Sequence, residues 1–263
     1  MPDAGGGTGT SSEAPFVEGG VSFILSPDKL DITVKVTTSD GTSVTVEGCT
    51  VTTLTSDTET TLHAKDILVI LKGKITELKC YSNQLTELNV QGLTALQKLD
   101  CDKNQLTALD VQGLTALQYL TCSDNQLTSL NVQGSTALQG LFCRNNQLIE
   151  LNVQDLTALQ YLRCADNQLT ALNVQGLTAL KGLSCYNNRL NADAFKKLFD
   201  DLPQRADSDG ADCILYTEES GVTEGNHTDF TAPPELANAF NNAKTVKKWK
   251  MYKHVILSKK VEI

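Results

Sequence analysis

Apolar and polar positions repeat along the middle of the chain with a period of 21 residues. One unit reads LQKLDCDKNQLTALDVQGLTA, and residues alternate around its second Leu and its Cys. Leu99 and Cys101 therefore face one side, while the polar residues between and beside them face the other. This alternation predicts a short strand in every unit. Six units begin at Ile75, Leu96, Leu117, Leu138, Leu159 and Leu180.

The second half of each unit returns the chain along the opposite side of a coil. Its pattern is LTxL(N/D)V, in which Leu109 and Val111 point one way with Asp110 between them. One such turn cannot bury its apolar side, whereas six stacked turns form parallel strands about 4.8 Å apart and a continuous core. The pattern therefore predicts a solenoid over residues 75–190.

An Asn recurs where each predicted strand ends. A carboxamide at this place can bond backbone groups that a bend leaves exposed, so we interpret these residues as structural. They are Asn83, Asn104, Asn125, Asn146, Asn167 and Asn188.

The flanking segments are predicted to be caps, because a terminal turn would otherwise leave its apolar face and strand edge open. Residues 1–15 lack core-forming side chains and are predicted to be a flexible linker. Residues 16–74 contain alternating β-branched runs separated by turn residues, which predicts a β-rich N-terminal cap.

Residues 191–263 are predicted to form a C-terminal cap of helices and strands. Asn191 suits a helix N-cap, and a second amphipathic helix opens at Pro233 and Pro234. A strand is expected near Cys213–Tyr216, and an extended segment over residues 249–257.

The repeats resemble bacterial leucine-rich repeats of 21 residues with the consensus LxxLxCxxNxLxxLDVxxLTA, sometimes called the IRREKO type. The setting is similar to that of secreted or surface leucine-rich repeat proteins of spirochaetes, the treponemal leucine-rich repeat protein among them, and of gut anaerobes. The resemblance covers residues 75–190. It implies an α/β leucine-rich-repeat solenoid with a concave parallel sheet, a secreted, periplasmic or cell-surface location, and a role in binding macromolecules.

Charge and composition narrow the functional classes. The chain has 263 residues with 22 Lys and Arg against 31 Asp and Glu, and its net charge of −9 argues against nucleic-acid binding. Three His leave little material for acid–base catalysis, so we expect no enzyme. No apolar run is long enough for a transmembrane segment. A monomer is favoured.

The cysteines are predicted to be buried free thiols rather than a metal or cofactor site. Six of the eight recur in a core slot at the repeat period, so their side chains form a row and do not converge on one point. We name Cys80, Cys101, Cys122, Cys143, Cys164 and Cys185 the cysteine ladder. The state of Cys49 and Cys213 is left open.

Aromatic residues within the repeats occupy the third, fifth or seventh place of a unit, and these places face the predicted concave surface. An exposed set of Tyr, Phe and Arg is typical of a binding hot spot. The alternative is that the rings stack between strands and stiffen the sheet. The candidate binding residues are Tyr81, Tyr119, Phe142, Arg144, Tyr161, Arg163 and Tyr186.

These observations predict a non-catalytic module that binds a protein or glycan, in a bacterial adhesion or host-interaction protein. The alternative is a passive cell-envelope component whose Lys-rich C-terminal end makes the contacts. Asn226-His227-Thr228 matches a glycosylation sequon, to which we give no weight. The C-terminal lysines are Lys244, Lys247, Lys248, Lys250, Lys253, Lys259 and Lys260.

Overall fold

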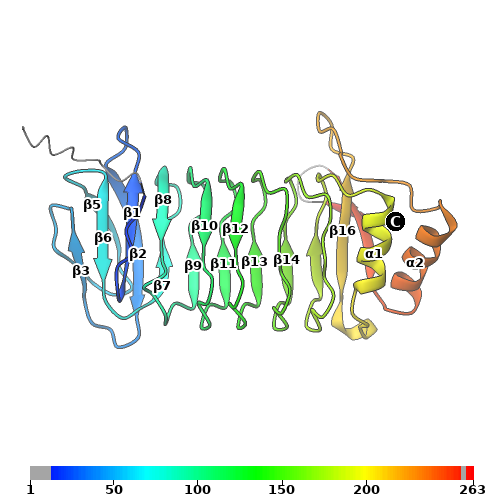
Figure 1. Ribbon diagram of the computed structural model, residues 1–263, viewed down its shortest axis with the longest axis horizontal. Helices are drawn as coiled ribbons and strands as arrows, with labels where there is room; N and C mark the ends of the chain where they lie inside the picture. Colours follow the sequence, from blue (N-terminus) through cyan, green and yellow to red (C-terminus); the bar gives the residue numbers. More distant parts are fainter. Residues whose placement is uncertain (1–12, 256–258) are drawn as a thin grey trace, which may run out of the picture.

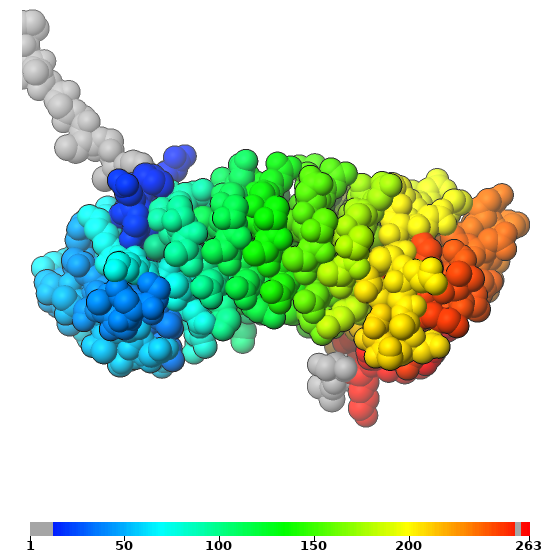
Figure 2. All heavy atoms as spheres, turned by 90° about the horizontal axis from the view of Figure 1, so that it is seen from below, coloured from blue at the N-terminus to red at the C-terminus, as the bar shows by residue number. Residues whose placement is uncertain are grey.

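The computed structural model describes residues 13–255 and 259–263. They form an elongated stack of turns that runs from the N-terminal to the C-terminal end (Figures 1 and 2). One side of the stack is a sheet of 11 strands in the order β18-β17-β16-β15-β14-β13-β11-β9-β7-β2-β5. The repeats contribute β7 (Ile75–Lys79), β9 (Lys98–Asp100), β11 (Tyr119–Thr121), β13 (Gly140–Phe142), β14 (Tyr161–Arg163) and β15 (Gly182–Ser184).

These repeat strands are parallel and in register, as the 21-residue period predicts. Leu99 lies beside Leu78 and Leu120, and the same alignment continues to Leu183. The aligned Leu side chains and the cysteine ladder are buried, while the residues between them face outward. The alternation expected from the sequence is confirmed here.

The opposite side of the stack has far less regular pairing. Strand β8 (Leu85–Asn89) belongs to a separate sheet, and β10 (Ala108–Asp110) pairs with β12 (Ser129–Asn131) in parallel. Beyond β12 the return segments form no strand within the described residues, and no backbone hydrogen bond there joins residues 128–133 to residues 149–154. Neighbouring turns are therefore held together by backbone hydrogen bonds mainly on the parallel-sheet side.

The N-terminal end covers both sides of the first repeat with antiparallel strands. Strand β2 pairs with β7, and β1 pairs with β8, so neither edge of the first turn is open. The strands are β1 (Gly20–Leu25), β2 (Asp31–Thr38), β3 (Val44–Glu47), β4 (Thr53–Leu54), β5 (Glu59–His63) and β6 (Leu68–Lys72).

The linker prediction ends too late in the sequence. Residues 1–12 lie outside the described part of the chain, but Ala14 is buried. Its carbonyl accepts a hydrogen bond from Asn89 Nδ2 at 3.0 Å, and Ser22 Oγ bonds the Pro15 carbonyl at 2.5 Å. This stretch therefore packs against β1 and β8 and is not a free linker.

The C-terminal end continues the parallel sheet and adds two helices. Helix α1 (Ala192–Asp201) begins after Asn191, whose side chain accepts from the Ala194 amide at 2.9 Å. It is followed by a short 3-10 helix (Asp207–Asp209), β16 (Asp212–Thr217), α2 (Pro234–Thr245), β17 (Lys250–His254) and β18 (Lys260–Glu262). The two helices pack together beyond β16 (Figure 1). Neither of them has the length and apolar content of a membrane span; this holds for the described residues.

The recurring Asn side chains bind successive turns to one another. Asn146 Nδ2 donates to the carbonyls of Cys122 and Cys143 at 3.0 and 3.1 Å, and its Oδ1 accepts from the Leu127 amide at 2.9 Å. Asn104, Asn167 and Asn188 repeat this pattern. The structural interpretation of these residues is confirmed.

Asn226 extends this row beyond the repeats. Its Oδ1 accepts from the Leu190 amide at 2.8 Å, and its Nδ2 donates to the carbonyls of Cys185 and Leu215, both at 2.9 Å. The residue is only 6% exposed. The Asn226 side chain of the sequon is therefore buried and has a structural role.

All eight cysteines are free and buried, Cys49 and Cys213 included. Burial raises the pKa of the ladder thiols from Cys80 to Cys164, and it brings that of Cys143 to about 12. At Cys185 a hydrogen bond with Cys213 raises the pKa most, followed by burial. Within the described residues no group of His, Cys, Asp or Glu is arranged to hold a metal ion.

Candidate functional site: the parallel-sheet face

The outward side of the parallel strands carries three columns of side chains, and we call it the parallel-sheet face. Register places the third residues of successive units next to one another, so Lys98, Tyr119, Gly140, Tyr161 and Gly182 follow in one column. The fifth residues form a second column, in which Phe142 lies between Thr121 and Arg163. The seventh residues form the last column. The predicted site residues are thus distributed over all three columns.

Three aromatic rings of this face lie over glycines: Phe142 over Gly140 of its own strand, and Tyr119 and Tyr161 over glycines of the next strand. A Cβ at Gly140 would come within 2.8 Å of Phe142 Cε2 and 2.9 Å of Tyr119 Cδ1. A Cβ at Gly182 would come within 2.7 Å of Tyr161 Cδ1. The rings therefore rest on the sheet where glycine leaves room, and each remains partly exposed.

We call Tyr119, Phe142 and Tyr161 the aromatic patch. Phe142 and Tyr161 lie on adjacent strands but in different columns, since Tyr161 is opposite Gly140 and Phe142 is opposite Arg163. Their arrangement is diagonal, and it supports both a contact surface and the stacking role that the sequence left open.

Tyr186 is not part of an exposed surface, contrary to the prediction. It is 5% exposed, and its ring stacks on His254 at 4.6 Å between ring centroids with an interplanar angle of 5°. Burial raises the pKa of its hydroxyl. Strand β17 supplies this cover, because it brings His254 onto the seventh-residue column from far along the chain.

Tyr81 is exposed, at 44%, but lies apart from the aromatic patch. It belongs to the first repeat, two strands before Tyr119 and in the seventh-residue column. The structure therefore does not bring Tyr81 together with the other aromatic candidates.

The two predicted arginines differ in their partners. Arg144 Nε donates to Asp166 Oδ2 at 2.6 Å, and its guanidinium lies 5.7 Å from the centroid of the Tyr186 ring. Arg163 has neither a hydrogen bond nor an ion pair from its side chain within the described residues, and its Nη1 is shielded from solvent. Of these two arginines, only Arg144 has an acidic partner within the described residues.

Acidic side chains occupy the part of the face next to the first repeats. Lys98 Nζ pairs with Glu77 Oε1 at 2.7 Å. Asp102 accepts from the Ser123 amide at 2.5 Å, and burial raises its pKa to about 6, with smaller contributions from the nearby carboxylates of Asp100 and Asp124. This end of the face carries charges of both signs, because Lys79 and Lys98 lie beside the carboxylates, whereas the aromatic patch and Arg163 lie toward its C-terminal half.

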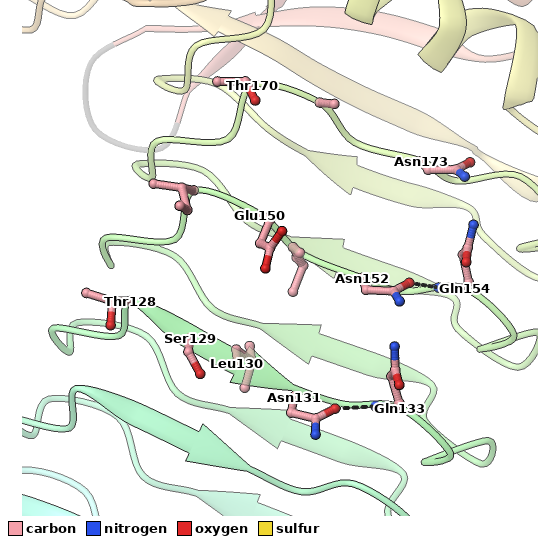
Figure 3. A pocket seen from close by; sticks show the side chains of 13 residues that line it. Thr128, Ser129, Leu130, Asn131, Gln133, Glu150, Asn152, Gln154, Thr170 and Asn173 are labelled. Atoms are coloured by element: carbon pink, nitrogen blue, oxygen red, sulfur yellow. Dashed lines mark hydrogen bonds between the residues drawn. The ribbon is translucent and has the colours of Figure 1, made fainter.

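A groove of about 710 Å³ lies on the opposite side of the stack, and the sequence analysis did not identify it. Its lining comes from successive return segments (Figure 3). In these segments Asn131 and Asn152 accept hydrogen bonds from the backbone amides of Gln133 and Gln154. Ile149, 61% exposed, replaces the Thr found at this place in four of the other five units. That break in the Thr column is the sequence signal that marks the groove.

The C-terminal lysines are mostly occupied by contacts within the chain. Lys253 pairs with Glu218 at 2.7 Å, and Lys260 pairs with Asp212. Lys247 donates to the carbonyl of Phe199, at the C-terminal end of helix α1. Within the described part of the chain, the side chains without such a partner are Lys248, Lys250 and Lys259.

Comparison with protein-family models finds no match, and comparison with curated proteins finds none either. Among solved structures, a leucine-rich repeat protein of Leptospira interrogans is 24% identical with a TM-score of 0.44, over 63% of this chain and 38% of that one. The functional domain of InlJ from Listeria monocytogenes, which includes a cysteine ladder, is 27% identical with a TM-score of 0.39, over 62% of this chain and 38% of that one. An internalin, InlF, from the same organism is 18% identical with a TM-score of 0.45, over 68% and 55% of the two chains. This chain thus spans less than two thirds of the length of each of these bacterial proteins, to which it is similar.

Proposed function

We propose that this chain is a non-catalytic binding module that contacts a protein partner through the aromatic patch of its parallel-sheet face. The proposal includes a location outside the bacterial cytoplasm and assignment of the repeats to the 21-residue bacterial type. The observation that carries it is the aromatic patch itself, in which three partly exposed rings lie on one rigid sheet. Aromatic side chains held in place by a scaffold lose little conformational freedom on binding, so they are common anchors of interfaces.

The architecture supports this proposal because the strands hold the rings without requiring them for the core. Leu141 and Leu162 fill the interior from the same strands that carry Phe142 and Tyr161 outward. The contact surface can therefore be altered while the Leu core stays intact.

The test is binding of the purified chain to an array of extracellular matrix proteins and glycans. We expect Phe142→Ala or Tyr161→Ala to weaken binding to an array protein by about 2 kcal/mol, which is about 30-fold, as truncation of an interface anchor does. The matched control is Ile149→Ala, which removes an exposed apolar side chain from the opposite side. Binding that survives both patch substitutions and is lost with Ile149→Ala would move the site to the groove.

A charge-reversal variant distinguishes the structural alternative. Lys248→Glu with Lys250→Glu changes two unpaired cations of the C-terminal end. Loss of binding in this variant, together with full binding by the patch variants, would favour the envelope component that makes contacts through its lysines.

A further inference from the structure

The Arg163 guanidinium is a cation that the chain leaves without an acceptor. Its five N–H groups make no hydrogen bond within the described residues, and Nη1 is also cut off from solvent. A charged donor with neither water nor an acceptor is unfavourable. Nε and Nη2 also lack an acceptor but are not shielded in this way, so an incoming anion can accept hydrogen bonds from them.

The carboxylate nearest along the strand is already engaged. Asp166, three residues after Arg163, accepts from Arg144 Nε at 2.6 Å and from Asn187 Nδ2 at 2.8 Å. Lys98, at the N-terminal end of the face, is likewise paired with Glu77. Unlike Arg144 and Lys98, Arg163 has no counter-charge within the described residues. Lys181, whose Nζ lies 5.1 Å from the centroid of the Tyr161 ring, also has no ion pair there.

Aromatic side chains lie beside this cation. Phe142 lies opposite Arg163 on the adjacent strand, and Tyr161 lies two residues earlier on the same face. The guanidinium also reaches over the column of third residues, where Arg163 Nη2 would be 3.6 Å from a Cβ at Gly182. A ligand that covers these rings would exclude water from the guanidinium and so strengthen a charge-assisted hydrogen bond.

We propose that Arg163 receives the carboxylate of an Asp or Glu side chain of a protein partner, while an apolar side chain beside it packs on Phe142 and Tyr161. This inference rests on the proposed function, since it names the chemistry recognised by the same patch. One guanidinium matches one carboxylate, and the planar fork allows two parallel hydrogen bonds. A polyanion is disfavoured because Asp102, Asp124 and Asp166 lie on the same side of the sheet. Phe142 favours an apolar peptide side chain as the neighbouring contact.

The experiment selects peptides from a random 12-residue library on the full chain and measures the best binder by calorimetry. We expect enriched peptides to carry an Asp or Glu next to an aromatic or aliphatic residue. Arg163→Gln should weaken the selected peptide at least tenfold, and replacing the peptide's acidic residue by its amide should weaken binding to the unaltered chain by a similar factor. The two changes together should cost little more than either alone, because they remove the same contact.

The control variant is Arg189→Gln, which removes an exposed Arg whose side chain has no partner within the described residues and should leave the affinity unchanged. The melting temperature of Arg163→Gln should equal or exceed that of the unaltered chain, because the substitution removes an unpartnered donor. Phe142→Ala separates the carboxylate inference from the proposed function. Peptides that lose affinity with Phe142→Ala but keep it with Arg163→Gln would overturn the carboxylate inference and leave the proposed function standing.

Other outcomes also overturn the inference. A library that yields no acidic motif would contradict it, as would two independent effects in the double substitution. If no peptide binds and a sialylated glycan binds in an Arg163-dependent manner, the recognised carboxylate belongs to a sugar and the assignment to a protein partner is wrong. If neither Phe142→Ala nor Arg163→Gln affects any ligand, the proposed function fails as well.

Discussion

Replacing Asn146 by Ala tests how strongly the row of Asn side chains stabilises the repeats. The side chain occupies the strand end and is nearly buried. Its removal leaves the Leu127 amide without the acceptor that it has at 2.9 Å. It also removes one of the two carboxamide donors that reach Cys122 O and one of the two that reach Cys143 O.

The magnitude follows from counting these groups separately. A buried amide without an acceptor costs about 1–3 kcal/mol. Each Cys carbonyl keeps one donor, from Asn125 or from Asn167, so each loss is smaller, about 0.5 kcal/mol. We therefore expect Asn146→Ala to lower the free energy of unfolding by about 2–4 kcal/mol.

Urea unfolding followed by far-ultraviolet circular dichroism measures this change, with an unaltered m-value as the sign that the compactness of the two states is the same. Gln147→Ala is the matched control, because Gln147 is the next residue, is exposed and has no side-chain hydrogen bond within the described residues. It should change stability by no more than about 0.5 kcal/mol. If Asn146→Ala resembled Gln147→Ala, water would replace the carboxamide without loss, and the structural role of the row would be refuted.

Three further predictions follow from burial. The cysteine ladder should resist alkylation in the native chain and react completely after denaturation without reductant, as counted by mass spectrometry; two or more disulfide-linked ladder thiols would contradict this. Asp102 has a folded pKa of about 6, above the ordinary value, so its contribution to stability is present below about pH 4 and is lost as the pH rises through 6. The free energy of unfolding of Asp102→Asn, minus that of the unaltered chain, should therefore be larger at pH 7 than at pH 4 when both are measured by urea unfolding. An equal difference at both pH values would refute the raised pKa. Tyr186→Ala should lower stability by about 2–5 kcal/mol, in the range of a core truncation, whereas Tyr81→Ala should have little effect; the reverse order would restore Tyr186 to the binding surface.

The repeats could be predicted from the sequence because each unit confirms its neighbours. Leu99 and Cys101 alone define only a short alternating segment, but the same pattern at the same spacing fixes the register of every strand. The end strands lack this support. Strand β5 (Glu59–His63) has no clear signal in the sequence, because Leu62 is its only fully buried residue and its other side chains are polar or exposed.

The errors at the site arise from contacts between distant segments. Tyr186 has the same place in its unit as Tyr81, so the sequence treats the two alike. His254 on β17 and Arg144 on an earlier turn cover the Tyr186 ring, whereas Tyr81 stays exposed. The alternation of Tyr119, Gly140, Tyr161 and Gly182 was readable in the sequence, but its meaning depends on how the rings lie on the sheet.

This alternation limits how the parallel-sheet face can change. Leu and Cys at the fourth and sixth places fill the core, so substitutions at the third, fifth and seventh places leave it intact, except at Tyr186, which is buried against His254. The third column is nevertheless coupled, because a side chain at Gly140 would displace both Tyr119 and Phe142, and one at Gly182 would displace Tyr161. Under the function proposed above, a new specificity on this face requires a ring and the glycine beneath it to change together, within one strand or between adjacent strands.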